Sequence, residues 1–394
     1  MIFQPVSEYK DAKDVASFIK ESVDRIKETV GDERIYIPVS GGVDSSSVAA
    51  MIRDAVGDSM IAEHYDHGGM RKWEPRKVVD ELSNSFPVTL LDKREYFMKS
   101  VIDAGEDPEA KRRKGVSDPY FMTMFSRATS EGCKYVADGT IAPDLSETLD
   151  TKLKWQHNIA SDEKKALFEK SKLQFIHPLY YVAKPMSRAI ANYYGLPTKR
   201  RPFPGPGLYI RAIGQVTPEK MRIVREADSI ATPLLEKFVE TDENKLDKQY
   251  FVAIADSWRR NVSIDQRGLR MENPMIYRAQ GTGMSNYQRT YGHLLVFDSD
   301  NEIPILIQKA NEVVRVNREK NIGRIAVNLA EEKRGNYIAL LRAIETKDFT
   351  RAMVVPVVRN ELESVAFSLM TAIPELNQVA FDVQDKPDST IEYE

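Results

Sequence analysis

The sequence has only one cysteine, Cys133, in 394 residues. A single cysteine excludes a disulfide within the chain and a metal site of the Cys-x-x-Cys kind. Such scarcity is typical of proteins from a reducing compartment, so we expect a cytoplasmic protein. The sequence also lacks any run of about 18 apolar residues, which excludes a membrane-spanning helix. Its first residues, MIFQPVSEYKDAKDV, lack the basic start and apolar run of a signal peptide.

An excess of charge of one sign is missing as well. The 56 lysines and arginines nearly balance the 59 aspartates and glutamates, which leaves a formal net charge of -3. This balance gives no overall attraction to nucleic acid or membranes, and we expect neither as a partner. The chain is 42% hydrophobic and 29% charged, as globular proteins commonly are, and it is long enough for two domains.

The first half of the chain alternates between short apolar runs and amphipathic stretches. The apolar runs predict strands at 35–39, 60–65, 88–91 and 135–137. Between and before them, the spacing of apolar residues predicts helices at 11–30, 45–56, 75–86 and 118–131. This alternation indicates an α/β fold, a parallel sheet with helices on both faces.

A proline- and glycine-rich run, Arg201-Pro-Phe-Pro-Gly-Pro-Gly-Leu208, interrupts the chain after this part. Such a run cannot continue a helix or a central strand, so we place a domain boundary before it, giving domains at 1–200 and 201–394. The second domain is predicted to be α+β. We expect helices at 218–238 and 359–372, and strands at 291–297, 303–308, 338–344 and 379–383.

The most informative stretch is Ser40-Gly-Gly-Val-Asp-Ser-Ser46, between a predicted strand and a predicted helix. Two glycines let the backbone approach an anion closely, and the first turn of the helix offers N–H groups and hydroxyls to phosphate oxygens. Asp44 beside a phosphate indicates a Mg²⁺ ion between them. The simpler interpretation is a glycine turn capped by Asp44 and Ser45. The phosphate-binding residues predicted here, which the resemblance described next assigns to ATP, are Ser40, Gly41, Gly42, Val43, Asp44, Ser45 and Ser46.

The run SGGVDSS resembles the pyrophosphate-loop signature of the N-type ATP pyrophosphatases. Members of that group break ATP between its α- and β-phosphates and activate a second substrate as an adenylate. The resemblance implies an adenine nucleotide alpha hydrolase-like first domain that uses Mg²⁺ with ATP. It identifies the cleavage and leaves the acceptor open.

Further motifs are similar to those of the GMP synthetase family. The ending Lys386-Pro-Asp-Ser-Thr-Ile-Glu-Tyr-Glu394 resembles KPPATIEWE, and Leu341–Phe349 resembles ALRAVETxDF. The stretches 67–72, 138–144 and 201–208 are similar to other motifs of that family in the same order. The likeness extends from about Lys20 to the end of the chain. The exception is roughly 298–335, which we could not match and interpret as an insertion.

This resemblance implies that the chain converts XMP to GMP through an adenylated XMP, using Mg²⁺ and ATP and releasing AMP and pyrophosphate. The implied catalytic residues are Asp44, Arg71, Lys154 and His157, with Asp44 also as the metal ligand. The implied XMP-binding residues are Arg201, Pro204, Gly205, Gln280, Lys386, Thr390, Ile391 and Glu392. The second domain would form a homodimer, as is general in the family.

Some positions depart from the family pattern. The family segment KSHHNVGG reads Lys154-Trp-Gln-His-Asn-Ile-Ala160 here, and Asp138 replaces a glutamine. Because a lost histidine changes proton handling, two alternatives stay open. One is a ligase that adenylates a different nucleotide or purine-like acceptor. The other is a catalytically weak, nucleotide-binding regulatory subunit.

A glutaminase is absent from the sequence as well. Glutamine-dependent family members carry one with a catalytic cysteine, whereas Cys133 lies where a predicted helix meets a predicted strand. We therefore expect the nitrogen to come from free ammonia or from a separate glutaminase subunit.

Overall fold

The computed structural model of the 394-residue chain describes residues 14–141, 172–198, 203–239, 247–285, 288–346, 351–386 and 388–394. The chain divides into two compact units. The first contains residues up to 68 together with 73–97 and 117–200, and the second contains 69–72, 98–116 and 201–394. The predicted boundary at 200 had left 69–72 and 98–116 in the first domain. They belong to the second because Lys111 donates a hydrogen bond to the carbonyl of Gly214 (2.9 Å), and Leu208 donates one to the carbonyl of Gly69 (2.6 Å).

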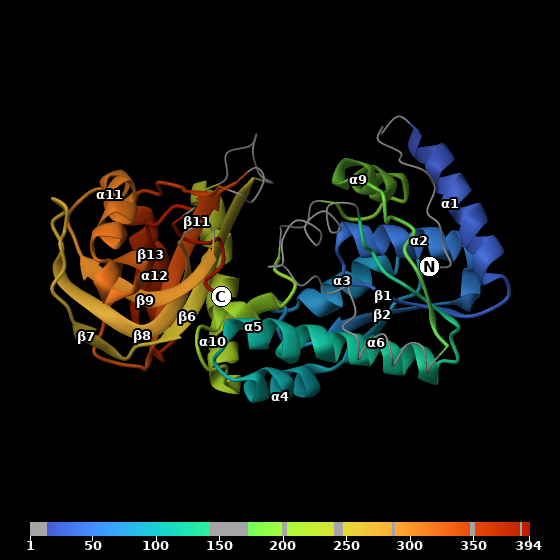
Figure 1. Ribbon diagram of the computed structural model, residues 1–394, viewed down its shortest axis with the longest axis horizontal. Helices are drawn as coiled ribbons and strands as arrows, with labels where there is room; N and C mark the ends of the chain where they lie inside the picture. The colour runs from blue at the N-terminus through green and yellow to red at the C-terminus, as the bar shows by residue number, and fades with distance from the viewer. Residues whose placement is uncertain are drawn as a thin grey trace. The chain divides into compact units, whose positions relative to one another are not determined.

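The first unit contains a five-stranded sheet with helices on both sides (Figure 1). Its strands are β1 (Ile35–Pro38), β2 (Met60–Asp66), β3 (Thr89–Asp92), β4 (Tyr135–Ala137) and β5 (Gln174–Ile176). Its helices are α1 (Val15–Val30), α2 (Val43–Val56), α3 (Glu74–Leu82), the start of α4 (Arg94–Ala104), α6 (Asp118–Ser130) and α9 (Lys184–Tyr193). All the strand pairs are parallel, so the predicted α/β fold is confirmed.

Strand β1 is buried on both faces, which explains its unbroken apolar sequence. Ile35 and Ile37 pack into a core that also contains buried residues of α1, α2 and α9. Tyr36 points to the opposite face, where it packs with Phe121 and Met124 of α6. Figure 1 shows α2 and α9 on one side of this sheet and α6 on the other. The sheet is therefore the middle layer of three.

The order of strands in this sheet is β3-β2-β1-β4-β5. The chain moves from β1 outward through β2 to β3, and β4 then pairs with the other side of β1. The strand order thus reverses between β1 and β4. In open parallel sheets, the loops that follow the two strands at such a reversal diverge and leave room for a ligand at the carboxyl ends. Those loops are 39–42 and 138–141 in this chain.

The second unit is built on an eight-stranded mixed sheet. Its strands are β6 (Lys248–Asp256), β7 (Arg259–Asn261), β8 (Glu272–Ser285), β9 (Gln288–Asp298), β10 (Ile322–Glu331), β11 (Tyr337–Glu345), β12 (Met353–Val354) and β13 (Leu376–Asp382). Its helices are α5 (Pro108–Ala110), a π-helix at Lys111–Ser117 that reaches one residue into the first unit, α10 (Pro218–Val239), α11 (Ile303–Val316) and α12 (Arg359–Ala372). Short 3₁₀ turns lie at Gly57–Ser59 in the first unit, and at Gly207–Arg211 and Arg318–Lys320 in the second.

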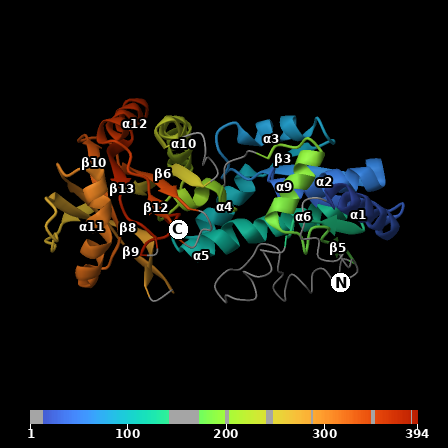
Figure 2. The ribbon, with the colours of Figure 1, turned by 90° about the horizontal axis from the view of Figure 1, so that it is seen from above.

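The strand order of the second sheet is β12-β11-β13-β10-β9-β8-β7, and β6 also pairs with β11. Helices α10 and α12 pack against each other and against strands of this sheet, as Figure 2 shows. Residues that alternate along β6 and β11, together with Ala380 of β13, form a core with the buried ring of Tyr393, near the end of the chain. The end of the chain is thus anchored in the hydrophobic interior by Tyr393.

Two predictions for the second domain are wrong. The run at 303–308 forms the first half of helix α11. The segment 298–335, interpreted as an insertion, supplies β10, which pairs with β9 on one side and β13 on the other. Since a strand in the interior of a sheet holds its neighbours in place, this segment is integral to the second unit.

In the part of the chain that the structure describes, no helix has the length and apolar character needed to cross a membrane.

Candidate active site

The predicted ATP-binding loop lies at the carboxyl end of β1, where the strand order reverses. Gly41 has φ of 75°, a left-handed conformation that a glycine adopts without strain. Helix α2 begins at Val43, two residues earlier than predicted, with Gly42 as its N-cap. Val43 to Ser46 therefore form the first helical turn, where backbone N–H groups and the helix dipole favour an anion.

The two serines of the loop fix its shape. The hydroxyl groups of Ser40 and Ser45 lie 3.0 Å apart, and the Ser45 hydroxyl also donates to the carbonyl of Gly42 (3.3 Å). The backbone N–H of Gly42 donates to the Ser40 hydroxyl (3.2 Å). These bonds hold the glycine turn against the N-terminus of helix α2.

Asp44 lies in the first turn of α2 and has two close partners from helix α9. Lys184 places its Nζ 2.5 Å from Oδ2 of Asp44, and the hydroxyl of Ser187 donates to Oδ1 at 2.5 Å. Lys184 occupies the first turn of α9, where a cation opposes the helix dipole. The negative charge of Asp44 compensates for the unfavourable interaction between Lys184 and the dipole of α9. The lysine side chain is 43% exposed, so water reaches this ion pair.

The turn after β4 approaches the loop closely. A Cβ atom on Gly139 would lie 2.6 Å from the backbone nitrogen of Ser45 and 3.0 Å from the carbonyl carbon of Asp44. Only glycine permits this contact between the turn and the first turn of α2. The backbone N–H of Thr140 donates to the Asp138 carboxylate (3.0 Å), which fixes the conformation of the turn.

Asp138, one of the departures from the family pattern, has a partner that the sequence interpretation missed. Nδ1 of His177, just after β5, lies 2.8 Å from Oδ1 of Asp138. Burial alone would raise the pKa of Asp138, but the hydrogen bond and charge of His177, with the bonds from Thr140, lower it below the ordinary value. Burial alone would lower the pKa of His177, but the bond to Asp138 and its charge raise it. Both pKa shifts favour the charged forms, an aspartate beside an imidazolium.

This pair should make stability depend on pH. The contribution of His177 is complete below the ordinary histidine pKa of about 6.5 and is lost as pH rises through its raised folded pKa. The contribution of Asp138 is complete above the ordinary aspartate pKa of about 4 and is lost as pH falls through its lowered folded pKa. We expect the advantage of the wild type over His177→Gln, measured by urea unfolding, to be largest near pH 5.5 and smaller at pH 8.5. An advantage that grows with pH would contradict this account.

The predicted XMP-binding residues that the structure describes all lie in the second unit. The stretch Gly281–Gly283 of β8, next to the exposed Gln280, contacts the C-terminal segment, which we define as residues 388–394. Thr282 donates from its backbone N–H and its hydroxyl to the carbonyl of Tyr393, at 2.8 and 2.7 Å. The hydroxyl of Thr390 lies 3.3 Å from the carbonyl of Thr282. Residues more than one hundred positions apart are thereby brought together.

Arg71 also lies in the second unit, among residues of the predicted acceptor side. Its guanidinium is 4.3 Å from the ring centre of Phe203, and its Nε is 3.7 Å from Oδ2 of Asp228. Asp228 also pairs with Arg211 (3.4 Å), which in turn pairs with Glu392 (2.9 Å). A chain of charges therefore connects Arg71 to the C-terminal segment. Its predicted role beside the phosphates of ATP stays a prediction.

Two other predicted site residues, Pro204 and Lys386, form backbone contacts. Pro204 accepts a hydrogen bond from the N–H of Gly207 (2.8 Å), within the turn that holds Gly205. Lys386 forms a bridge with Ala352 at the edge of the sheet. Three predicted residues, Lys154, His157 and Arg201, lie outside the described residues, as do Trp155 and Gln156.

A metal ion bound at Asp44 would need most of its ligands from a substrate and from water. Among the described residues, no group of three or more histidine, cysteine, aspartate or glutamate side chains could enclose a metal ion. Mg²⁺ commonly takes one or two carboxylates, with phosphate oxygens and water completing its shell. Asp44, in the first turn of α2, could supply one such carboxylate.

An open parallel sheet with a glycine loop at its switch point, followed by an aspartate at the start of the next helix, is the arrangement of a nucleotide-binding α/β domain. Comparisons with known proteins give the family. The model of the GMP synthase C terminal domain matches residues 320–393. That match includes 320–335, which the sequence interpretation had assigned to an insertion.

The relatives match the chain over nearly its full length. It is 32% identical over 385 residues to the B subunit of the glutamine-hydrolyzing GMP synthase of Saccharolobus solfataricus, covering 97% of this chain and 100% of the relative. The protein of the same name from Methanopyrus kandleri is 30% identical over 389 residues, covering 97% and 99%. The chain therefore belongs to the family of GMP synthase B subunits. Among solved structures, NMN synthetase from Francisella tularensis matches 49% of this chain and 77% of its own at 13% identity, with a TM-score of 0.38, which is too low to bear on the fold.

Proposed function

We propose that this chain catalyses the ATP-dependent amination of XMP to GMP. The observation that carries the proposal is an intact glycine loop at the switch point, in a chain that aligns from end to end with GMP synthase B subunits. The C2 oxygen of XMP would attack the α-phosphorus of ATP, and the bond to pyrophosphate would break. Ammonia would then add at C2, and the C2–O bond would break with release of AMP.

The proposed reaction assigns a role to residues of both units. The N–H groups at the start of α2 and the hydroxyls of Ser40 and Ser45 would hold the pyrophosphate, with Lys184 supplying positive charge. Mg²⁺ bound by Asp44 and phosphate oxygens would neutralise the charge that develops on the leaving group. In the second unit, Gln280, Lys386 and the C-terminal segment would bind XMP.

The names of the relatives bear on the nitrogen source. They include glutamine hydrolysis and describe each relative as one subunit of its enzyme, which supports a separate glutaminase subunit as the partner of this chain. Free ammonium should then replace that glutaminase in vitro. We further propose that the protein is cytoplasmic and forms a homodimer through the second domain. Light scattering coupled to size-exclusion chromatography would test the dimer.

The test is an assay of the purified chain with Mg-ATP, ammonium and XMP. Pyrophosphate release is followed with a coupled enzyme, and GMP is separated by chromatography. Equal amounts of pyrophosphate and GMP, with neither formed when XMP is left out, are the expected result. Pyrophosphate release that is equally fast with IMP or AMP in place of XMP would show that the acceptor is wrong.

A further inference from the structure

Two buried arginines lie on either side of one buried aspartate, below the C-terminal segment. Asp382 is the last residue of β13, which lies between β11 and β10 in the sheet. Arg342 of β11 and Arg324 of β10 reach its Oδ2 at 2.9 and 3.2 Å. None of the three side chains has measurable exposure. The register places them on one face of three adjacent strands, since Leu341 pairs with Phe381 and Ala326 with Asp382.

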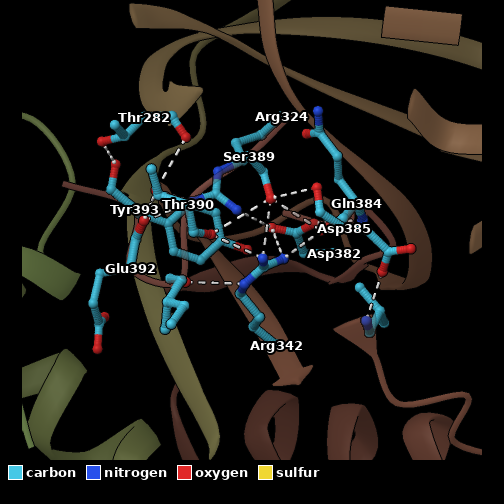
Figure 3. A network of polar contacts seen from close by, with 12 residues as sticks. Thr282, Arg324, Arg342, Asp382, Gln384, Asp385, Ser389, Thr390, Glu392 and Tyr393 are labelled. Atoms are coloured by element: carbon cyan, nitrogen blue, oxygen red, sulfur yellow. Dashed lines mark hydrogen bonds and ion pairs between the residues drawn. The ribbon is translucent and has the colours of Figure 1, made fainter. Parts of the chain in front are cut away.

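Arg342 uses its other hydrogen bonds on the backbone around the C-terminal segment (Figure 3). It donates to the carbonyls of Gln384 (3.1 Å), Thr390 (2.9 Å) and Ile391 (3.0 Å). It also donates to the hydroxyl of Ser389 (3.2 Å). One guanidinium therefore ties both ends of the turn between β13 and the segment to the sheet.

Arg324 holds the other side of the segment. It donates to the hydroxyl of Thr390 (2.7 Å) and to the carbonyl of Glu392 (2.6 Å). Its aliphatic stem fills the space above Gly281, where a Cβ atom would lie 2.6 Å from Cγ of Arg324. Its guanidinium lies 4.7 Å from the ring centre of Tyr393.

The two buried arginines need the carbonyl groups of the segment as hydrogen-bond acceptors, and the segment is held by the same hydrogen bonds. Burial and the charge of Arg342 lower the pKa of Arg324 to about 10, so its guanidinium is still charged at neutral pH. One aspartate cannot satisfy two guanidiniums, and a buried charge is tolerated only when its donors are hydrogen-bonded. The carbonyls at 384 and 390–392 supply those acceptors. The observed conformation of the segment satisfies the arginines, and the arginines in turn hold the segment in it.

We propose that Arg342 and Arg324, joined by Asp382, are positioning residues for the acceptor nucleotide, because they hold Thr390, Ile391 and Glu392 in the conformation that binds it. The proposal rests on the proposed function for the identity of that nucleotide. Neither arginine has an exposed atom with which to bind a substrate directly, so both act through the segment. Loss of their contacts should weaken the use of XMP while the ATP-binding loop, in the first unit, is unchanged.

The test uses Arg342→Lys, which retains a charge for Asp382 and loses the forked donors. We expect KM for XMP to rise roughly tenfold, the loss of about one charge-assisted hydrogen bond, with KM for ATP unchanged. Hydrogen–deuterium exchange of residues 388–394 should become faster. The matched control is Arg259→Lys on β7 of the same sheet, where Arg259 donates to Tyr277 and Gln378 (both 2.6 Å) and pairs with Glu331, without contact to the segment. It should change neither quantity.

Ser389→Ala provides a second variant in case Arg342→Lys does not fold, because it removes one Arg342 contact and leaves the arginines intact. It should shift exchange and KM for XMP in the same direction, by less. Exchange of 388–394 that stays at the wild-type rate in these variants, or a KM for XMP equal to that of the control, would overturn the proposal. If the wild type makes no GMP from XMP, the proposed function fails, and the exchange rates still decide whether Arg342 holds the segment.

Discussion

Replacement of Asp44 by asparagine is expected to lower kcat for pyrophosphate release about 10³-fold, because Asp44 binds Mg²⁺ in the proposed mechanism, and loss of that ligand would remove several kcal/mol of charge stabilisation from the transition state. Asparagine has the same shape and can still accept from Ser187, but it has no charge to offer Lys184 or Mg²⁺. The apparent affinity for Mg²⁺ should fall in parallel, which a titration of activity against Mg²⁺ at saturating ATP measures.

Stability should change little in the same variant. The ion pair between Asp44 and Lys184 is partly exposed to water, and such pairs contribute about 1 kcal/mol or less. Asp58→Asn is the matched control. It lies just after the same helix, its side chain is 96% exposed, and it pairs only with Arg53 among the described residues. A loss of activity that is equal in both variants, or that follows a collapse of the thermal midpoint in Asp44→Asn, would contradict a catalytic role for Asp44.

Much of the fold was predictable because local sequence decides it. The helix at 359–372 has the predicted limits, and the glycine loop lies between a strand and a helix as expected. The run at 303–308 shows that a prediction from only six residues can mistake a helix for a strand. Its six residues suit a strand, but the apolar positions continue as Ile303, Leu306, Ala310 and Val313, which is helical spacing.

The parts of the candidate site that the sequence did not predict are contacts between residues distant in sequence. Lys184 lies 140 positions from Asp44, and His177 lies 39 from Asp138. Only the strand order brings them together, and one sequence does not give that order. A signal did exist at Lys184, since a lysine in the first turn of a helix opposes the helix dipole, and such a conflict often marks a functional residue.

In the C-terminal segment, the sequence predicted the residues themselves but not the buried arginine that holds them. Resemblance to the family indicated Thr390, Ile391 and Glu392, and the structure places Thr390 beside β8. The arginine beneath them, Arg324, was hidden in the segment interpreted as an insertion. Its function depends on the register of β10 against β13, which has no local signature in the sequence.

The second large effect is expected from Gly139→Ala. The new Cβ would lie 2.6 Å from the backbone nitrogen of Ser45 and 3.0 Å from its Cα, and backbone atoms cannot rotate out of the way. The turn and the first turn of α2 must therefore separate by roughly 1 Å, a displacement that can cost about 10²-fold in rate when it misplaces reacting groups. We expect kcat/KM for ATP to fall by about this factor, with a loss of about 1–3 kcal/mol in unfolding free energy from overpacking.

Gly132→Ala separates the effect on the site from the effect on stability. Gly132 lies between α6 and β4, has φ of 67°, and a Cβ there would meet no atom within 4 Å. Alanine at that position is strained by roughly 1–2 kcal/mol and touches nothing in the site. The control should therefore lose comparable stability in urea unfolding and retain its kcat/KM. If both variants keep their activity once the folded fraction is taken into account, the close contact of Gly139 stabilises the fold without positioning the ATP-binding loop. A loss confined to Gly139→Ala shows that the turn after β4 sets the position of the first turn of α2.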